Sequence, residues 1–235
     1  MVDWPAHSDR VKQRYGDKLP MALRIRHLIL TAISAADLLP GTRLIEADLG
    51  QQLAVSRTPL REALAGLKAD GLLRYDEDGL RIRQLDWDDV TSLYGMRATL
   101  EAMAAGEAAT RASAAEKNVI NQICKDEQSM KQGAAQPDAL AEINAQFHAS
   151  ILAAAGNIFL TESFERLSRL LILLGATTYS LPSRAKAIQR EHDAINDAIQ
   201  AGDRPAAEEA MKHHLGQALE ARLIIMARNG MKAMD

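Results

Sequence analysis

The chain has 235 residues, of which 47% are hydrophobic but only 4% aromatic, which predicts a mainly helical protein with room for two modest domains. One cysteine, Cys124, excludes an internal disulfide, and the lack of a long apolar run or signal peptide excludes a membrane protein, so we expect a cytoplasmic location. The net charge of −3 does not favour nucleic-acid binding. Residues 1–83, however, are mildly basic, with 13 Lys and Arg against 11 Asp and Glu, whereas the remainder is acidic, with 15 against 20.

The first third of the chain predicts a small helical domain over residues 19–84, preceded by a polar, mobile arm over 1–18. Apolar residues at helical spacing indicate a helix over 19–36, which the Pro and Gly of "LLPGT" end. A short helix follows at about 46–53. A third helix begins after Ser56, a plausible N-cap, and "LLRY" and "LRIR" around "DEDG" then predict a β-hairpin.

Helix, helix, turn, helix and hairpin is the order of a winged helix-turn-helix. The third helix offers Arg57, Thr58, Arg61 and Lys68 on the face opposite its apolar stripe. Donors near the N-terminal end of such a helix can contact guanine edges or phosphates in the major groove. An ordinary solvated face explains the same pattern, so periodicity alone leaves both interpretations open.

The rest of the chain predicts a six-helix antiparallel bundle over residues 85–230, followed by a tail over 231–235. We expect its helices near 86–112, 114–131, 136–155, 157–179, 183–201 and 203–229.

Polar residues interrupt the apolar stripes of four of these helices. Asn144 and His148 lie one turn apart, and His192 and His214 each occupy an inward position on another helix, as does Arg97. Inward polar groups are costly unless they meet one another or a bound species. Three converging imidazoles can hold a divalent metal, although a satisfied polar core remains the alternative.

The segment "LLPGTRLIEADLGQQLAVSRTPLREALAGLKADGLL" strongly resembles the DNA-binding domain of the GntR family of bacterial transcription regulators, and "VSRTPLREAL" is its most specific part. The resemblance covers residues 20–84. It implies double-stranded DNA as partner, with Gly79 at the tip of the wing and DNA contacts from the following residues: Arg43, Ser56, Arg57, Thr58 and Arg61. Asp78, before the wing glycine, and the acidic "IEAD" depart from residues that are basic in other members.

The second part resembles the FCD effector domain of the FadR subgroup, and its six helices point to the shorter, VanR-like type. The resemblance rests on "YGMRATLEAMAA", "NAQFHASILAAAGN", "EHDAINDAIQAGD" and "AMKHHL". It implies a divalent metal, zinc or alternatively nickel or another ion, held by Asn144, His148, His192 and His214. Asp is the commoner residue at position 144, so we expect weaker metal affinity with the uncharged amide.

A divalent ion among neutral ligands favours an anionic effector, so we expect a small carboxylate-containing molecule in the bundle. Arg97 is the expected second anchor, with Glu101, Arg169 and Tyr179 as further lining residues. A buried ion pair between Arg97 and Glu101, one turn apart, is the alternative for that pair.

Together these features predict a ligand-responsive transcription regulator, a repressor that binds a pseudo-palindromic operator as a homodimer and is released by its effector. Two alternatives remain open at this point. One is a metalloenzyme with a three-histidine metal site, for which the inner stripes offer only Glu101 as a base. The other is a constitutive DNA-binding protein whose inward polar cluster is structural.

Overall fold

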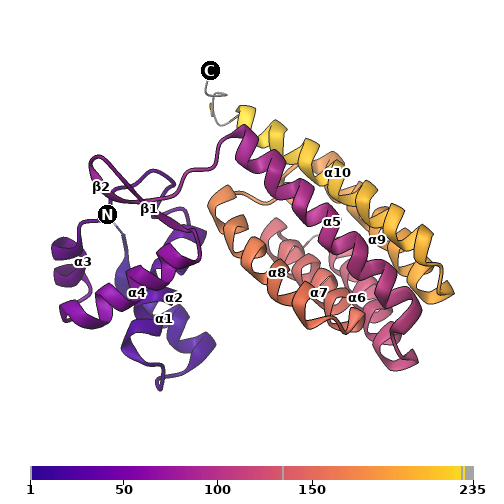
Figure 1. The fold of residues 1–235 in the computed structure, drawn as a ribbon, viewed down its shortest axis with the longest axis horizontal. Coiled ribbons are helices and arrows are strands. Elements are labelled where there is room, and N and C mark those ends of the chain that lie inside the picture. Colours follow the sequence, from indigo (N-terminus) through magenta and orange to yellow (C-terminus); the bar gives the residue numbers. More distant parts are fainter. Residues whose placement is uncertain (1, 134, 229, 231–235) are drawn as a thin grey trace. The chain divides into compact units, whose positions relative to one another are not determined.

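The computed structural model describes residues 2–133, 135–228 and 230, and its contacts divide the chain into two compact units (Figure 1). The first unit contains the chain up to Leu85 together with Ser168–Gly175, and the second contains Asp86–Leu167 and the chain from Ala176 onward. The expected domain boundary between residues 84 and 85 lies one residue before this division. The return of Ser168–Gly175 to the first unit has no signal in the sequence pattern.

The first unit is the predicted winged helix-turn-helix. It comprises α1 (Trp4–Tyr15), α2 (Met21–Ser34), α3 (Glu46–Gln52), α4 (Arg57–Ala69), β1 (Leu73–Asp76), β2 (Gly79–Ile82) and the 3-10 helix η1 (Arg169–Leu174). Apolar residues from α2 and α4 form its centre, where Ile25, Ile29 and Leu67 have no exposed surface. The two strands pair antiparallel from Leu73 opposite Ile82 to Asp76 opposite Gly79, which makes the expected hairpin.

The interpretation of residues 1–18 as a mobile arm is wrong for Trp4–Tyr15, which form α1. Asp3 caps this helix by accepting a hydrogen bond from the Ala6 amide, and a proline occupies its first turn. Trp4, His7 and Val11 are buried on one face, and α1 packs against α2. The Trp4 indole donates to Gln52 Oε1 at 2.8 Å, so the N-terminal helix is tied to α3 as well.

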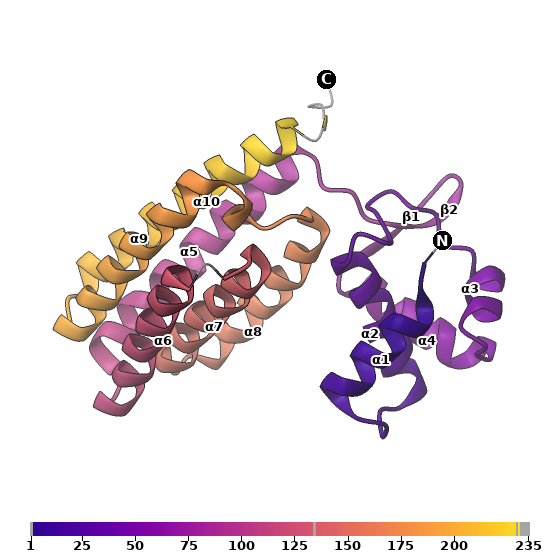
Figure 2. The same ribbon diagram turned by 180° about the vertical axis from the view of Figure 1, so that it is seen from behind.

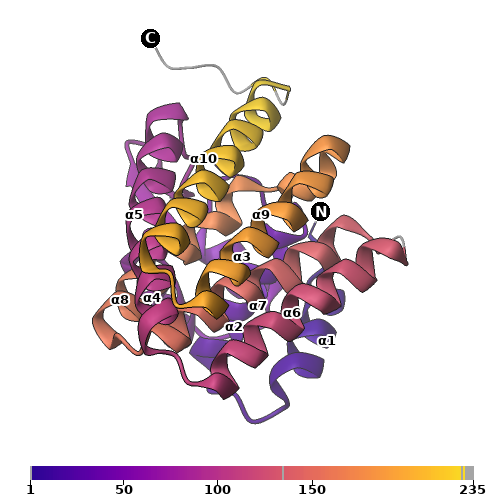
Figure 3. The same ribbon diagram turned by 90° about the vertical axis from the view of Figure 1, so that its right-hand side faces the viewer.

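The second unit is the predicted helical bundle. It comprises α5 (Trp87–Arg111), α6 (Ala114–Gln132), α7 (Pro137–Ala155), α8 (Ile158–Ser168), the 3-10 helix η2 (Thr178–Ser180), α9 (Pro182–Ala201) and α10 (Arg204–Arg228). Helices α5 and α10 run side by side, and α6 lies against α7 (Figures 2 and 3). The predicted end of the last helix at residue 229 and the tail over 231–235 lie outside the described residues.

Small side chains let these helices approach closely. Ala102, Ala105 and Ala109 of α5 are buried in the core, and a Cβ added at Gly106 would lie 2.4 Å from Glu208 Oε1 of α10. Cys124 is buried in the same core, on α6. Among the described residues, no helix combines the length and apolar character that crossing a bilayer requires.

The helix expected over 157–179 is shorter than predicted. The α-helix ends at Ser168, η1 continues to Leu174, and Gly175 then takes a positive φ of 67°, a conformation that an α-helix cannot contain. Apolar periodicity continues through "LSRLLILLG", and for this reason the sequence does not reveal where the α-helix changes to the tighter 3-10 form.

Candidate functional site

Three histidines from three helices meet in the interior of the bundle. His148 of α7, His192 of α9 and His214 of α10 are all buried, and each offers a ring nitrogen within 4.8 Å of those of the other two. The Nε2 atoms of His148 and His214 lie 3.3 Å apart. Phe147 stacks on His192 with 4.1 Å between ring centroids, which fixes the plane of that ring. The structure thus brings together the three histidines that the sequence places on inward stripes.

Each of these histidines contacts a different buried glutamate through its Nδ1. Glu101 Oε2 lies 2.5 Å from Nδ1 of His148, Glu127 Oε2 lies 2.7 Å from Nδ1 of His192, and Glu191 Oε2 lies 2.7 Å from Nδ1 of His214. At His192 and His214 this contact is a hydrogen bond, in which the carboxylate holds the proton on Nδ1 and leaves the Nε2 lone pair free, as in most histidine metal sites. The arrangement therefore orients three imidazoles as ligands.

A cation accompanies each glutamate. Arg97 Nε donates to Glu101 Oε1 at 2.9 Å, and Lys131 Nζ lies 2.9 Å from Glu127 Oε1. Arg184 pairs with Glu191 and also donates to the carbonyl oxygen of His214 at 3.2 Å. The cluster consequently repeats one chain of contacts, from cation to carboxylate to imidazole, and its three glutamates are balanced by three cations.

These partners keep the carboxylates ionised. Burial raises the pKa of Glu101, but Arg97 and His148 outweigh burial and bring that pKa to about 2. For Glu127, burial is opposed by His192 and Tyr179, and for Glu191 by His214 and Arg184, again with a pKa of about 2 in each case.

For two of the imidazoles, the effect of burial on the pKa outweighs that of the neighbouring carboxylates. Burial lowers the pKa of His192 and outweighs the attraction of Glu127. Burial likewise lowers the pKa of His214 to about 3, despite its hydrogen bond with Glu191. Both rings are therefore neutral near pH 7, which is the form that binds metal.

The donor set fits a divalent metal. His192 Nε2 is buried and has no hydrogen-bond partner in the part of the chain that the structure describes. Such an unpaired polar atom is costly in a core, and coordination to a metal would satisfy it. Neutral imidazole nitrogens suit zinc, nickel and similar ions, so the chemistry does not select one metal.

Asn144 lies one turn before His148 on α7 and is partly exposed. Its side chain makes no hydrogen bond to any other described residue, which leaves its amide oxygen available. Its role as the fourth ligand stays a prediction.

Of the four residues expected to line an effector site, three contact members of the histidine cluster and one lies in the first unit. Arg97 and Glu101 form the buried ion pair that the sequence left as an alternative. Tyr179 is buried, and its hydroxyl donates to Glu127 Oε1 at 2.6 Å, so it supports His192 through Glu127. Arg169 belongs to the first unit, where its Nη1 lies 2.7 Å from Asp70 Oδ1. The structure therefore does not group Arg169 with the histidine cluster.

Sequence reasoning missed four members of the cluster, which are Glu127, Lys131, Glu191 and Arg184. Glu127 follows the buried residues Ile120 and Cys124 at helical spacing, and this pattern could have identified it. Glu191 adjoins His192 in the sequence, yet it contacts His214 of another helix instead. That contact depends on the packing of α9 against α10, which periodicity does not specify.

The residues expected to contact DNA lie in the first unit, and those on α4 are exposed. Ser56 takes the N-cap position but accepts no capping hydrogen bond, and Arg57 and Thr58 follow it in the first turn. Arg61 Nε donates to Glu46 Oε2 of α3 at 3.0 Å.

The wing holds Gly79 at a φ of 123°, which favours glycine, and a Cβ there would lie 3.5 Å from Nε of Arg43. Arg81 of the wing pairs with Asp76 and Asp78. Its charge is therefore largely neutralised, in line with the acidic character of "DEDG".

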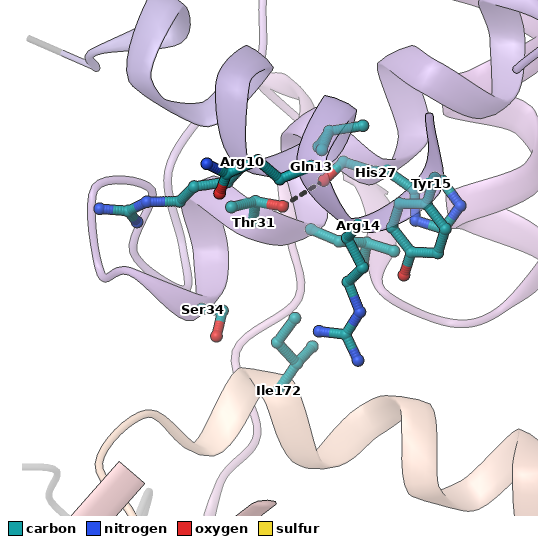
Figure 4. A pocket seen from close by; sticks show the side chains of 10 residues that line it. Arg10, Gln13, Arg14, Tyr15, His27, Thr31, Ser34 and Ile172 are labelled. Atoms are coloured by element: carbon teal, nitrogen blue, oxygen red, sulfur yellow. Dashed lines mark hydrogen bonds between the residues drawn. The ribbon is translucent and has the colours of Figure 1, made fainter. Parts of the chain in front are cut away.

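The first unit also contains a hollow of about 590 Å³ between α1, α2 and η1 (Figure 4). Arg10, Arg14 and Ile172 line it, together with Tyr15 stacked on His27 at 4.1 Å between ring centroids. Burial, followed by the charges of Arg26 and Arg14, lowers the pKa of His27. The hollow shares no residue with the histidine cluster.

Comparison with known proteins identifies the family. Residues 21–78 match the gntR family of bacterial regulatory proteins, and residues 92–217, more than half of the chain, match the FCD domain. The chain is a GntR-family regulator with an FCD domain. A probable D-xylose utilization operon transcriptional repressor of Paenarthrobacter nicotinovorans is 31% identical over 86% of this chain and 88% of its own length. The uncharacterized HTH-type transcriptional regulator YdhC of Bacillus subtilis is 27% identical over 77% of this chain and 81% of its own.

Solved structures support the fold. The structure of E. coli McbR/YncC covers 90% of this GntR regulator and 99% of its own chain, with a TM-score of 0.68 at 20% identity. A GntR regulator from Rhodococcus sp. RHA1 gives a TM-score of 0.65 at 21% identity, covering 86% and 97% of the two chains. The family and its relatives are transcription regulators, so this chain is a regulator and not an enzyme, and the metalloenzyme alternative is set aside.

Proposed function

We propose that this GntR regulator is a metal-dependent, ligand-responsive repressor that acts in the cytoplasm. It binds a pseudo-palindromic operator as a homodimer and is released by a small organic acid bound near the metal in the FCD domain. The single observation that carries the proposal is the buried trio of His148, His192 and His214, each with its own glutamate on Nδ1. The relative named as a transcriptional repressor supports repression rather than activation.

The charge balance of the cluster supports an anionic effector. Each buried glutamate already has one cation beside it, from Arg97, Lys131 or Arg184, so the protein groups alone are close to neutral. When bound, a divalent ion would add two positive charges in a low-dielectric interior, where they attract a carboxylate. His148, His192 and His214 would hold the ion, with Asn144 as the proposed fourth ligand.

Release from DNA requires that the effector bind two arrangements of the protein with different affinities. Gel shifts with a duplex selected by the wild-type chain from a randomised library test this requirement. We expect metal-loaded protein to lose affinity for that duplex when one of a panel of small carboxylic acids is added, and His148→Ala protein to lose this response. Operator binding that is indifferent to every acid and to metal removal would contradict the proposal.

The proposed homodimer draws support from α5 of the FCD domain. Met96 and Met103 lie two turns apart on one face of this helix, and both are about half exposed. Exposed apolar side chains on a common face are typical of an interface between protein chains. Sedimentation of the wild type should show a dimer, and Met96→Glu with Met103→Glu should shift it toward monomer; a wild-type monomer would contradict this part of the proposal.

A second candidate is a constitutive DNA-binding protein with a structural polar cluster. It is favoured by the pairing of all three glutamates with side chains of the protein itself. Thermal unfolding separates the two functions, because a ligand of the folded state raises the unfolding temperature. A temperature that changes with neither EDTA, zinc nor organic acids would favour the second candidate.

A further inference from the structure

Arg61, on the exposed face of α4, is held from one side by an acidic residue of the preceding helix. Its Nε donates to Oε2 of Glu46 at 3.0 Å, and Glu46 is the first residue of α3. Both side chains remain substantially exposed, at 66% for Arg61 and 39% for Glu46. The contact therefore lies on the surface that carries the expected DNA contacts.

Fold stability does not account for this ion pair. Exposed pairs add little to stability, because water screens the charges and two long side chains must be ordered. A carboxylate on the DNA-facing surface is also unfavourable for binding phosphates in general, since it repels them. The pair therefore calls for an explanation in terms of DNA recognition.

The geometry leaves the end of the guanidinium available. With Nε engaged by Glu46, the two terminal nitrogens of Arg61 have no hydrogen-bond partner within the described part of the chain. A pair of parallel N–H donors matches the O6 and N7 acceptors of guanine in the major groove. Glu46, Arg57 and Arg61 line one hollow of about 350 Å³ between α3 and α4, and of these two arginines only Arg61 is paired with Glu46 among the described contacts.

We propose that Glu46 is a positioning residue, which fixes Arg61 for end-on bidentate contact with a guanine and, by its negative charge, weakens binding to DNA of every sequence. The proposal rests on the proposed operator binding and adds the residue that sets its sequence discrimination. Holding the arginine in one conformation lowers the ordering cost of the correct contact. Repulsion of phosphates acts against every sequence equally, so it lowers general affinity without changing the ratio, and the gain in selectivity comes from the positioned Arg61.

The test compares two duplexes with the full chain. One is selected by the wild type from a randomised library, and the other has the same base composition in scrambled order. The matched control is Asp48→Ala, because Asp48 is also acidic, exposed and in the first turn of α3, but makes no ion pair with another described residue. Circular dichroism melts check that each variant folds.

For Glu46→Ala we expect tighter binding to the scrambled duplex but not to the selected one, so that the ratio of the two affinities falls about tenfold. Asp48→Ala should tighten binding to both duplexes alike and leave the ratio unchanged. Arg61→Ala should lower the ratio by itself, and adding Glu46→Ala to it should lower the ratio no further, because the two residues act as one unit.

An equal change of both affinities in Glu46→Ala, matching Asp48→Ala, would overturn the positioning role while leaving operator binding intact. Independent and additive losses in Glu46→Ala and Arg61→Ala would also overturn it. A wild type that does not distinguish the two duplexes would overturn the proposed operator binding and this inference together.

Discussion

The DNA-binding face of the first unit and the histidine cluster of the second use charged residues in opposite ways. On α4, Arg57 and Arg61 are exposed, and within the described part of the chain only Arg61 has an acidic partner. In the bundle, Arg97 and Arg184 are buried, and each is paired with a glutamate that in turn holds a histidine. Exposed charges keep their hydration until a partner arrives, whereas buried charges must be satisfied within the fold. The first arrangement suits contact with a large polyanion, and the second orients ligands for a small bound species.

The largest expected effect tests this contrast within one helix. Helix α5 carries two Arg–Glu pairs four residues apart, the buried pair Arg97–Glu101 and the pair Glu107–Arg111, whose arginine is exposed. Glu101→Gln should lower the free energy of unfolding by about 3–5 kcal/mol, because it leaves a buried guanidinium without its counter-charge. Glu107→Gln should lower it by less than about 1 kcal/mol. Urea unfolding measures both, and equal losses would mean that the pair around Arg97 is effectively hydrated.

A smaller effect is expected at the exposed face. Arg57→Ala should weaken binding to the selected duplex by about 1–3 kcal/mol without lowering stability, since the side chain is exposed and lies at the N-terminal end of α4. Arg111→Ala, which removes an exposed arginine from the other unit, serves as the control and should leave DNA affinity unchanged. Fluorescence anisotropy at fixed salt gives both values, and an unaffected Arg57 variant would exclude this residue from the interface.

Asn144→Asp sharpens the comparison at the cluster. A carboxylate at this position would add a charged ligand to three neutral imidazoles, so zinc affinity should rise on the order of tenfold, or about 1.4 kcal/mol. Gln146→Glu adds the same charge at an exposed position of α7 and should have little effect. Competition with a chromogenic chelator measures the change, and equal affinities for Asn144→Asp and the wild type would show that the residue is not a ligand.

The smallest effect concerns protons released when metal binds. Burial lowers the pKa of His214 to about 3, so this ring is neutral at pH 5.5, whereas an ordinary histidine with a pKa near 6.5 is mostly protonated there. Metal binding at pH 5.5 should therefore displace no proton from His214, and the total release should not exceed about two protons, one for each of the other two imidazoles. Calorimetry in buffers of different ionisation enthalpy counts these protons, and a release of about three would show that burial does not keep His214 neutral.

The sequence predicts much of this architecture because its signals are local. The "VSRTPLREAL" segment, the Pro and Gly breaks, and the inward positions of His148, His192 and His214 all follow from motif or helical period. The winged helix-turn-helix and the bundle are both confirmed.

The elements that the sequence does not predict depend on tertiary contacts. Helix α1 has only three buried residues in twelve, and its burial depends on the partners that α2 and α3 provide. Similarly, the contacts of Glu127 with His192 and of Glu191 with His214 join different helices, and their register is set by packing rather than by either helix alone.

Cys124 gives the bundle an intrinsic reporter of its own opening. Burial raises the pKa of this thiol to about 12, so at neutral pH almost none of it is the thiolate that reacts with alkylating reagents. It is the only cysteine in the chain, and it lies in the core on the same helix as Glu127. Alkylation of the native protein should therefore proceed only through transient unfolding of the region around α6. The labelling rate then measures how strongly a bound metal or acid holds the bundle closed, without any engineered probe.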